Sequence, residues 1–312
     1  MDEFCILGID TSNYKTSVAV VTESGKILCN FQEFLTVKKG NRGLRQSEAF
    51  FQHVIKLPDL IQKAFNASEG KRISAVSVST KPRPVEGSYM PVFNAGKSAA
   101  EIISTACKVP LYTFSHQEGH IEAVRHQSEF RNNDDFISFH FSGGTTEALH
   151  VKQNHIKLVG GSKDLAMGQV LDRLGVTMGM NFPCGEEMDR KIENYASPGE
   201  NRLTKIKVKN CEMNLSGIET QCQRLYGSVP DADLIYMVFE RLSQAVEDMC
   251  INLEKSYGVK DFLFAGGVSS SRFMRSHLKE KLKEYRLCFG NPALSTDNAV
   301  GIAFLGGNRL WQ

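Results

Sequence analysis

One pattern of strand and turn signals occurs twice in this chain, and it constrains the possible fold more than any other feature. In the first copy, two β-rich runs flank a polar turn in residues 5–21, CILGIDTSNYKTSVAVV, and a third run, KILCNF, follows. In the second copy, residues 136–151, FISFHFSGGTTEALHV, have the same layout and are followed by IKLVGG. Apolar runs separated by turns rich in glycine or hydroxyl residues predict a three-stranded β-meander in each place.

Each predicted meander is followed by the same later elements. Apolar residues recur at helical intervals in residues 47–65 and 236–258, which predicts a long helix in each half. Both halves also contain a buried strand and then a helix, at 73–80 and 94–108 in the first and within 261–284 in the second. This parallel order favours an α/β fold of two related lobes, with mixed sheets and a cleft between them, over a chance similarity of two hairpins.

We expect the first lobe to span residues 1–112 and the second to span residues 113–297. The C-terminal helix, residues 298–312, is expected to pack back on the first lobe. A chain of 312 residues is long enough for two domains that each bury a core of their own.

Composition narrows the class of protein. The eight cysteines form no CxxC pair, so neither a disulfide framework nor a zinc knuckle is indicated. No apolar run reaches the about 20 residues that a membrane-spanning helix needs, and the acidic start is unlike a secretory signal. We therefore expect a cytoplasmic protein with reduced thiols and no membrane contact. The net charge of +2 is too small to identify a nucleic-acid binder, and the basic clusters at 37–45 and 81–84 are either solvated loops or nucleic-acid contacts.

Three turns at predicted strand ends carry residues suited to a nucleotide. Glycine lets the backbone approach a ligand closely and leaves N–H groups free to hold phosphate oxygens. Hydroxyl side chains can bind phosphate directly, and an aspartate can hold a divalent cation. A single turn of this kind usually has no ligand. Three such turns that face one expected cleft favour nucleotide binding. The residues are Asp10 and Ser12 in the first turn, Phe141, Ser142, Gly143, Gly144 and Thr145 in the second, and Gly266, Gly267 and Ser271 in the third.

Two histidines lie four residues apart in SHQEGHIEA, residues 115–123. On a helix, His116 and His120 would point in the same direction, either as two arms of a metal site or as polar residues on a solvated face. Asp297, just before an apolar run near the end of the chain, either caps a helix or supplies a third ligand. Two histidines and one carboxylate would form a facial site for zinc or ferrous iron, with positions open for substrate.

SHQEGHIEA and STDNAVGIAFLG, residues 295–306, resemble the HxEGH and TDNxAMIA motifs of the tRNA threonylcarbamoyladenosine synthase family. The resemblance covers nearly the whole chain. It implies the fold of the actin–hexokinase–chaperone ATPase superfamily, with two actin-like, ribonuclease H-like lobes. It also implies that His116, His120 and Asp297 hold one divalent metal ion, iron or zinc, and magnesium is a further candidate cofactor.

Other segments match less closely. Residues 160–190, GGSKDLAMGQVLDRLGVTMGMNFPCGEEMDR, resemble the family's DDAxGEAxDKxxxxLGxxYPGG stretch, which implies that Asp172 and Gly185 lie beside an adenine nucleotide. FSGGTTEALHV and FAGGVSSSRFM resemble the family's VSGGHT and GGVxAN segments, with Thr145 in place of a histidine and Ser271 in place of an asparagine. Lys15 and Lys163 stand where the family has acidic residues, which predicts a more cationic cleft that still suits a phosphate-bearing ligand.

The resemblance implies a metal-dependent acyltransferase that moves a threonylcarbamoyl group from its AMP anhydride to the exocyclic amine of the tRNA adenine beside the anticodon. The tRNA would be held mainly through its phosphates, with Lys38, Lys39, Arg42 and Arg45 as candidates. Two other interpretations remain open. The chain could be a phosphotransferase or ATPase on the same fold, or a non-catalytic nucleotide-binding partner that joins a related protein through the first lobe. A metalloprotease is not indicated, because HxEGH is not the HExxH motif.

Overall fold

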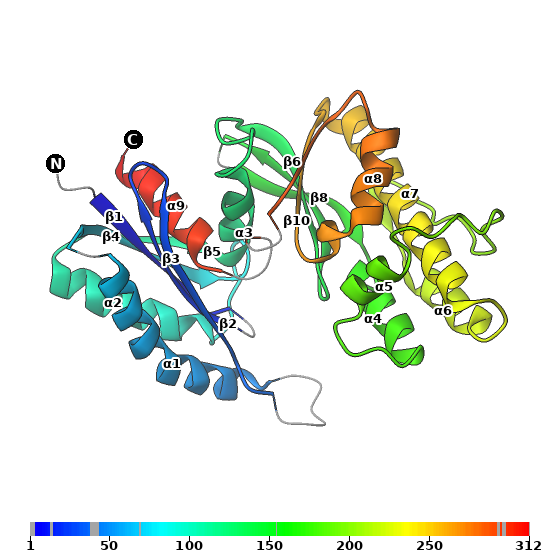
Figure 1. Ribbon diagram of the computed structural model, residues 1–312. Helices are drawn as coiled ribbons and strands as arrows, with labels where there is room; N and C mark the ends of the chain where they lie inside the picture. Colours follow the sequence, from blue (N-terminus) through cyan, green and yellow to red (C-terminus); the bar gives the residue numbers. More distant parts are fainter. Residues whose placement is uncertain are drawn as a thin grey trace. The chain divides into compact units, whose positions relative to one another are not determined.

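The computed structural model describes residues 4–12, 15–37, 44–68, 70–153, 155–291, 294 and 298–311. The chain forms two compact units, which are considered separately below (Figure 1). The first unit comprises Met1–Gln127 together with Thr296–Gln312, and the second comprises Ser128–Ser295.

The first unit contains a five-stranded mixed sheet. Strands β1 to β3 form an antiparallel meander, and β4 and β5 extend the sheet in the direction parallel to β1. The order across the sheet is β3-β2-β1-β4-β5. Their bounds are Phe4–Asp10 for β1, Lys15–Thr22 for β2, Ile27–Phe34 for β3, Arg72–Lys81 for β4 and Leu111–Ser115 for β5.

Helices cover both faces of this sheet (Figure 1). On one face, α1 (Gln46–Ala67) and α2 (Phe93–Cys107) bury an apolar stripe against alternate strand residues such as Leu7 and Val18. On the other face lie α3 (His116–Arg125) and α9 (Val300–Leu310). The C-terminal helix therefore belongs to the first unit.

Two close backbone contacts need glycine and hold α9 in place. A Cβ atom on Gly301 would lie 1.9 Å from the carbonyl oxygen of Gly119, so α3 and α9 touch backbone to backbone. A Cβ atom on Gly8 of β1 would lie 2.5 Å from the carbonyl oxygen of Ala299, at the start of α9. Through these two contacts, α9 holds α3 on the sheet. Any side chain at either glycine would force the elements apart.

The division between the units differs from the expected boundary after residue 112. The structure places it after Gln127, because β5 pairs with β4 in the first sheet and α3 packs on α9. The physical reason is the strand pairing of Leu111–Ser115, which the sequence pattern of that segment does not reveal. Both histidines of SHQEGHIEA consequently lie in the first unit.

The second unit repeats the topology of the first around its own sheet. Five of its strands follow the order β8-β7-β6-β10-β11, and they match β3-β2-β1-β4-β5 in order and relative direction. The predicted duplication of one α/β unit is thus confirmed. The strands are β6 (Asp135–Phe141), β7 (Thr146–Lys152), β8 (His155–Ser162), β9 (Glu212–Met213), β10 (Asp261–Ala265) and β11 (Arg286–Phe289).

The helices of the second unit share one hydrophobic core with its sheet. Phe139, Phe141 and Phe264 on the strands pack with the apolar faces of the helices, chiefly the long helix α7. No described helix is both long enough and apolar enough to cross a membrane. The helices are α4 (Met167–Thr177), α5 (Gly185–Lys191), α6 (Ser216–Leu225), α7 (Asp231–Tyr257), the 3₁₀ helix η1 (Val268–Ser270) and α8 (Arg272–Lys281).

Candidate functional site

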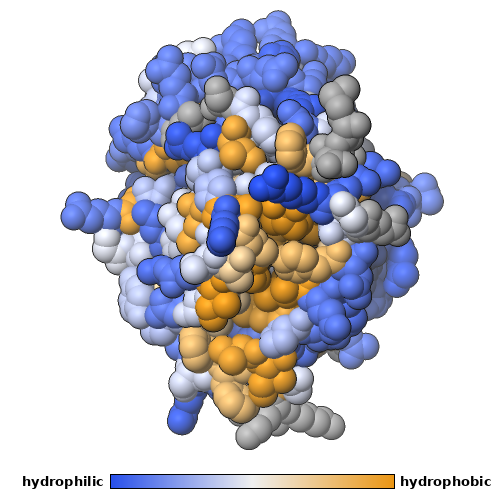
Figure 2. Space-filling view, turned by 90° about the vertical axis from the view of Figure 1, so that its left-hand side faces the viewer, coloured by the Kyte–Doolittle hydropathy of each residue, from blue (hydrophilic) through white to orange (hydrophobic). Residues whose placement is uncertain are grey.

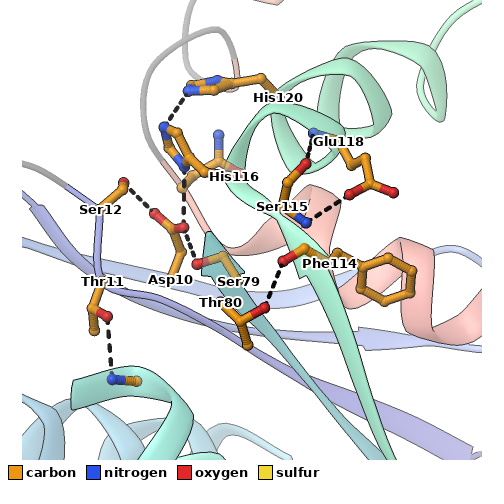
Figure 3. Close-up of polar contacts among 12 residues, drawn as sticks. Asp10, Thr11, Ser12, Ser79, Thr80, Phe114, Ser115, His116, Glu118 and His120 are labelled. Carbon is orange, nitrogen blue, oxygen red and sulfur yellow. Dashed lines mark hydrogen bonds and ion pairs between the residues drawn. The ribbon is translucent and has the colours of Figure 1, made fainter. Parts of the chain in front are cut away.

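The predicted site residues fall into two groups, one in each unit. In the first unit, Asp10 ends β1 and is completely buried. Its Oδ2 accepts a hydrogen bond from Ser12 Oγ at 2.6 Å, and its Oδ1 accepts one from Ser79 Oγ on β4 at 2.5 Å. His116 Nδ1 lies 3.1 Å from the same Oδ1 (Figure 3). The structure therefore brings three of the predicted residues, Asp10, Ser12 and His116, into contact.

The helix that carries the histidines begins at a well-formed cap. Ser115 Oγ accepts the N–H of Glu118, and Glu118 Oε2 accepts the N–H of Ser115, which together form a capping box. This cap makes His116 the first residue of α3 and places His120 one turn later, on the same side of the helix. Their Nε2 atoms lie 2.8 Å apart, and His120 is 7% exposed, so the solvated-face interpretation does not hold.

The protonation of His116 follows from its neighbour. Burial alone would raise the pKa of Asp10, but the charge and hydrogen bond of His116 and the two serine hydroxyls outweigh it and lower that pKa below its ordinary value. An ionised carboxylate can only accept, so the proton of this contact belongs to His116 Nδ1. The charge that lowers the Asp10 pKa is that of protonated His116; when His116 loses its other proton, Nδ1–H still donates to Asp10 and Nε2 carries a lone pair directed toward His120.

The donor set fits a metal ion. In a tetrahedral site with metal–nitrogen bonds of about 2.0–2.1 Å, two ligand nitrogens lie about 3.3 Å apart, which is about 0.5 Å farther than the 2.8 Å between the two Nε2 atoms. Within the described part of the chain, no group of three His, Cys, Asp or Glu side chains converges on one point. Asp297, the predicted third ligand, lies outside the described residues.

Thr11 anchors the turn that follows Asp10. Its hydroxyl donates to the carbonyl oxygen of Val92 at 3.3 Å and accepts the N–H of Gly96 at 3.1 Å, so the turn is tied to the start of α2 (Figure 3). A Cβ atom on Gly96 would lie 2.8 Å from the Thr11 hydroxyl, which explains glycine at that position.

The second group of predicted residues surrounds the turn between β6 and β7. The Ser142 hydroxyl accepts the N–H groups of Gly144 at 3.3 Å and Thr145 at 3.1 Å, so the serine organises these two groups. The start of α4 packs on this turn, because a Cβ atom on Gly168 would lie 2.6 Å from the Ser142 carbonyl oxygen. A Cβ atom on Gly144 would meet nothing within 4 Å, which leaves that side of the turn open to a ligand.

Asp172 reaches this turn from α4. Its Oδ1 accepts the N–H of Cys184 at 2.7 Å, immediately before Gly185 opens α5. Its Oδ2 lies 3.9 Å from the position that a Cβ atom on Gly143 would occupy. Burial raises the pKa of Asp172, although the Cys184 N–H opposes this effect. Asp172 therefore lies beside Gly143 and beside the start of α5.

The glycine turn after β10 lies against the end of β6. Gly266 has φ +92°, and a Cβ atom there would lie 2.3 Å from the carbonyl oxygen of Phe141, so only glycine fits. Because β6 and β10 are parallel neighbours, their carboxyl ends bring the two glycine turns to one edge of the sheet. Gly267 is open, since a Cβ atom there would meet nothing within 4 Å.

Ser271 is engaged in a contact that the sequence did not suggest. Its hydroxyl caps α8 by accepting the N–H of Met274 and donates to Asp189 Oδ1 at 2.6 Å. Asp189, on α5, also accepts the N–H groups of Arg272 and Phe273. Sequence reasoning missed Asp189 because nothing local distinguishes it from the other acidic residues of GEEMDR.

The two lysines that replace acidic residues are both engaged within their own units. Lys163 Nζ forms an ion pair with Glu212 at 2.6 Å. Lys15 Nζ donates to Gln32 Oε1 at 3.2 Å and lies 4.7 Å from the centre of the Phe34 ring. Glu212 offsets the charge of Lys163, so the added positive charge is smaller than the sequence suggests.

Solved structures with the same fold include several actin-like ATPase-fold proteins. HypF from T. kodakarensis matches with a TM-score of 0.67 at 12% identity, over 99% of this chain and 48% of HypF, so the chain spans about half of that protein. The activator of the 2-hydroxyisocaproyl-CoA dehydratase from Clostridium difficile, with bound ADPNP, matches with a TM-score of 0.57 at 12% identity over 98% and 95% of the two chains. At these identities the likeness shows the fold alone, and it confirms the predicted actin-like α/β architecture.

Sequence comparisons identify the family. The model of the TsaD family, described as tRNA N6-adenosine threonylcarbamoyltransferase, matches residues 27–304. A protein of that name from Neorickettsia sennetsu is 28% identical over 99% of this chain and 95% of its own length. Another, from Dictyoglomus turgidum, is 29% identical over 98% and 93%. The chain thus belongs to the tRNA N6-adenosine threonylcarbamoyltransferase (TsaD) family of acyltransferases.

Proposed function

We propose that this protein transfers a threonylcarbamoyl group from its AMP anhydride to the exocyclic amine of the tRNA adenine beside the anticodon. The observation that carries this proposal is the family match over residues 27–304, which includes His116, His120 and the whole of the second group. In this reaction the amine forms a new bond to the carbamoyl carbon, and AMP leaves with the electrons of the broken anhydride bond.

The first unit would supply a metal site. His116 and His120 would bind one divalent ion, iron or zinc, through their Nε2 atoms, and Asp297 would be the third ligand. When bound, such an ion would act as a Lewis acid that polarises a ligand oxygen. Magnesium beside the nucleotide phosphates is a further candidate. The two Nε2 atoms face one another from the same side of α3, which supports this assignment.

The second unit would bind the adenine nucleotide. The turn from Phe141 to Thr145 would bind phosphate or carboxylate oxygens, the hydrogen-bond acceptors, on its open side, where Gly144 leaves space. Asp172 would accept a hydrogen bond from a ribose hydroxyl, since its Oδ2 lies beside Gly143. Gly185, Gly266, Gly267 and Ser271 would border the base and sugar. Asp10 and Ser12, the other predicted nucleotide-binding residues, lie in the first unit beside His116.

The tRNA would be held mainly through its phosphates. Arg45, exposed just before α1, is a candidate contact. Lys38, Lys39 and Arg42, the other predicted contacts, lie outside the described residues.

A related protein of the same fold would bind the first unit through α1. Phe50, Phe51, Val54 and Ile55 form an exposed apolar stripe along this helix, with Phe51 64% and Ile55 60% exposed. Figure 2 shows apolar side chains gathered on the visible face of the molecule. Spacings of one and four residues are those by which helices pack on one another, so the partner would present a helix. The substitution Ile55→Glu should abolish the complex between this protein and its related partner, as measured by light scattering.

The test combines metal content with transfer to tRNA. Protein purified without added metal is expected to contain about one iron or zinc per chain by elemental analysis, and His120→Ala is expected to lose it. With threonylcarbamoyl-AMP and tRNA, the protein without substitutions should form threonylcarbamoyladenosine in the tRNA, and His120→Ala should not. His155→Ala, an exposed histidine on β8, is the matched control. Full metal content in His120→Ala would contradict the metal assignment.

The same preparations separate the other two candidate functions. A phosphotransferase or ATPase would turn over nucleotide in the absence of tRNA. A non-catalytic partner would bind nucleotide with no turnover under any condition.

A further inference from the structure

Asp10 is a carboxylate that the protein itself supplies with three hydrogen-bond donors. It is completely buried at the end of β1, and its two oxygens accept from Ser12, Ser79 and His116 (Figure 3). The donors come from three elements: the turn after β1, strand β4 and helix α3. A residue that binds a cation directly needs an oxygen directed at the ion, whereas these oxygens are directed at hydroxyl and imidazole groups.

The three donors also fix the plane of the carboxylate. Ser79 Oγ and Ser12 Oγ lie 2.5 Å and 2.6 Å from opposite oxygens, so the group cannot rotate without breaking one of them. Oδ1 thereby remains 3.1 Å from His116 Nδ1. The orientation of His116 is thus set by β1 and β4, in addition to the helix on which it lies.

We propose that Asp10 is a positioning residue that holds His116 in the Nδ1–H tautomer, with Nε2 directed to the point that His120 also faces. Asp10 would act through the imidazole, and it would touch neither the metal nor the nucleotide. Metal-ligating histidines commonly donate their second N–H to a carboxylate, which fixes the ring and increases its basicity. This inference rests on the proposed metal site, because a tautomer with an unprotonated Nε2 matters only if Nε2 binds an ion.

The first experiment measures the tautomer without any metal. In metal-free protein with ¹⁵N-labelled histidine, the ring nitrogens of His116 should show a protonated Nδ1 and an unprotonated Nε2. Asp10→Asn keeps the shape of the side chain but removes its charge, and it should produce a mixture of tautomers at His116. An unchanged Nδ1–H tautomer in this variant would overturn the inference.

The second experiment measures affinity for Zn²⁺ by competition with a chromophoric chelator. Loss of such a carboxylate partner typically weakens metal binding about 10–100-fold, and we expect this loss in Asp10→Asn. Ser79→Ala removes one support of Asp10 and should give a smaller loss in the same direction, which keeps the test decisive if Asp10→Asn does not fold. Ser77→Ala is the matched control, because Ser77 lies on the same strand, is equally buried and has no hydrogen-bond partner for its hydroxyl among the described residues.

The outcomes separate this inference from the proposed function. If the unvaried protein binds no Zn²⁺, or if His120→Ala binds it as tightly, the metal site itself is wrong. If His120→Ala loses Zn²⁺ while Asp10→Asn and Ser79→Ala keep the affinity of the Ser77→Ala control, the metal site stands and the role of Asp10 is wrong.

Discussion

His53 makes the stability of the first unit depend on pH. It lies on α1, is completely buried, and its Nδ1 is 2.8 Å from the Thr16 hydroxyl on β2. Its Nε2 is buried with no hydrogen-bond partner among the described residues. Burial, together with the charge of Lys56 and against that of Asp10, lowers the pKa of His53 from 6.5 to about 4. The folded protein therefore holds this histidine neutral.

The sign and size of the effect follow from this difference. The unfolded chain takes up a proton near pH 6.5, whereas the folded protein does so only near pH 4. Between these values the unfolded state binds more protons, so the free energy of unfolding falls as the pH falls. The loss is about 2 kcal/mol between pH 7 and pH 5 and about 3 kcal/mol once the pH is below 4. Above pH 6.5 the contribution is fully present.

Urea unfolding at pH 7 and pH 5 measures this loss. The only tryptophan, Trp311, follows α9 in the first unit, so its fluorescence reports the unfolding of that unit. His53→Asn keeps a polar group near Thr16 but cannot take up a proton, and it should remove about 2 kcal/mol of the difference between the two pH values. His155→Asn, at an exposed position, should leave the difference unchanged. If His53→Asn and the unvaried protein lose the same stability on acidification, the reasoning from burial is refuted.

Three further substitutions test the frame of the candidate site. Gly301→Ala should cost about 1–3 kcal/mol in urea unfolding, because its Cβ would meet the Gly119 carbonyl oxygen; Gly217→Ala, where nothing lies within 4 Å, should cost nothing. Ser115→Ala should cost about 1 kcal/mol through loss of the α3 cap, and an unchanged urea midpoint would contradict the role of the cap. Asp189→Ala should speed hydrogen exchange of the first amides of α8, which lose their acceptor. An unchanged exchange rate at these amides would contradict the role of Asp189 as their acceptor.

The two β-meanders were predictable from the sequence because strand periodicity and turn chemistry are local signals. The two meanders and the glycine turns at residues 141–145 and 266–267 appear where these signals place them. The histidine pair was also predictable, because four residues on a helix fix the direction of two side chains whatever surrounds them.

The partners of these residues were not predictable, because they come from distant parts of the chain. Ser79 lies 69 residues from Asp10 and reaches it only through the parallel pairing of β1 and β4. Asp189 lies 82 residues before the serine that it binds. The boundary after residue 112 was misplaced for a related reason, since the pairing of β5 with β4 is a property of the folded sheet.

The order of the chain has a consequence for its synthesis. The first unit is discontinuous: α9, which packs on β1 and α3, follows the whole second unit in the sequence. On the ribosome, the second unit can complete its core while the first still lacks this helix, so the α9-facing side of β1 and β4 remains uncovered during that interval. The histidine pair reaches its packed environment only when Gly301 arrives at Gly119. At the proposed metal site, metal capture would then report that synthesis has passed α9.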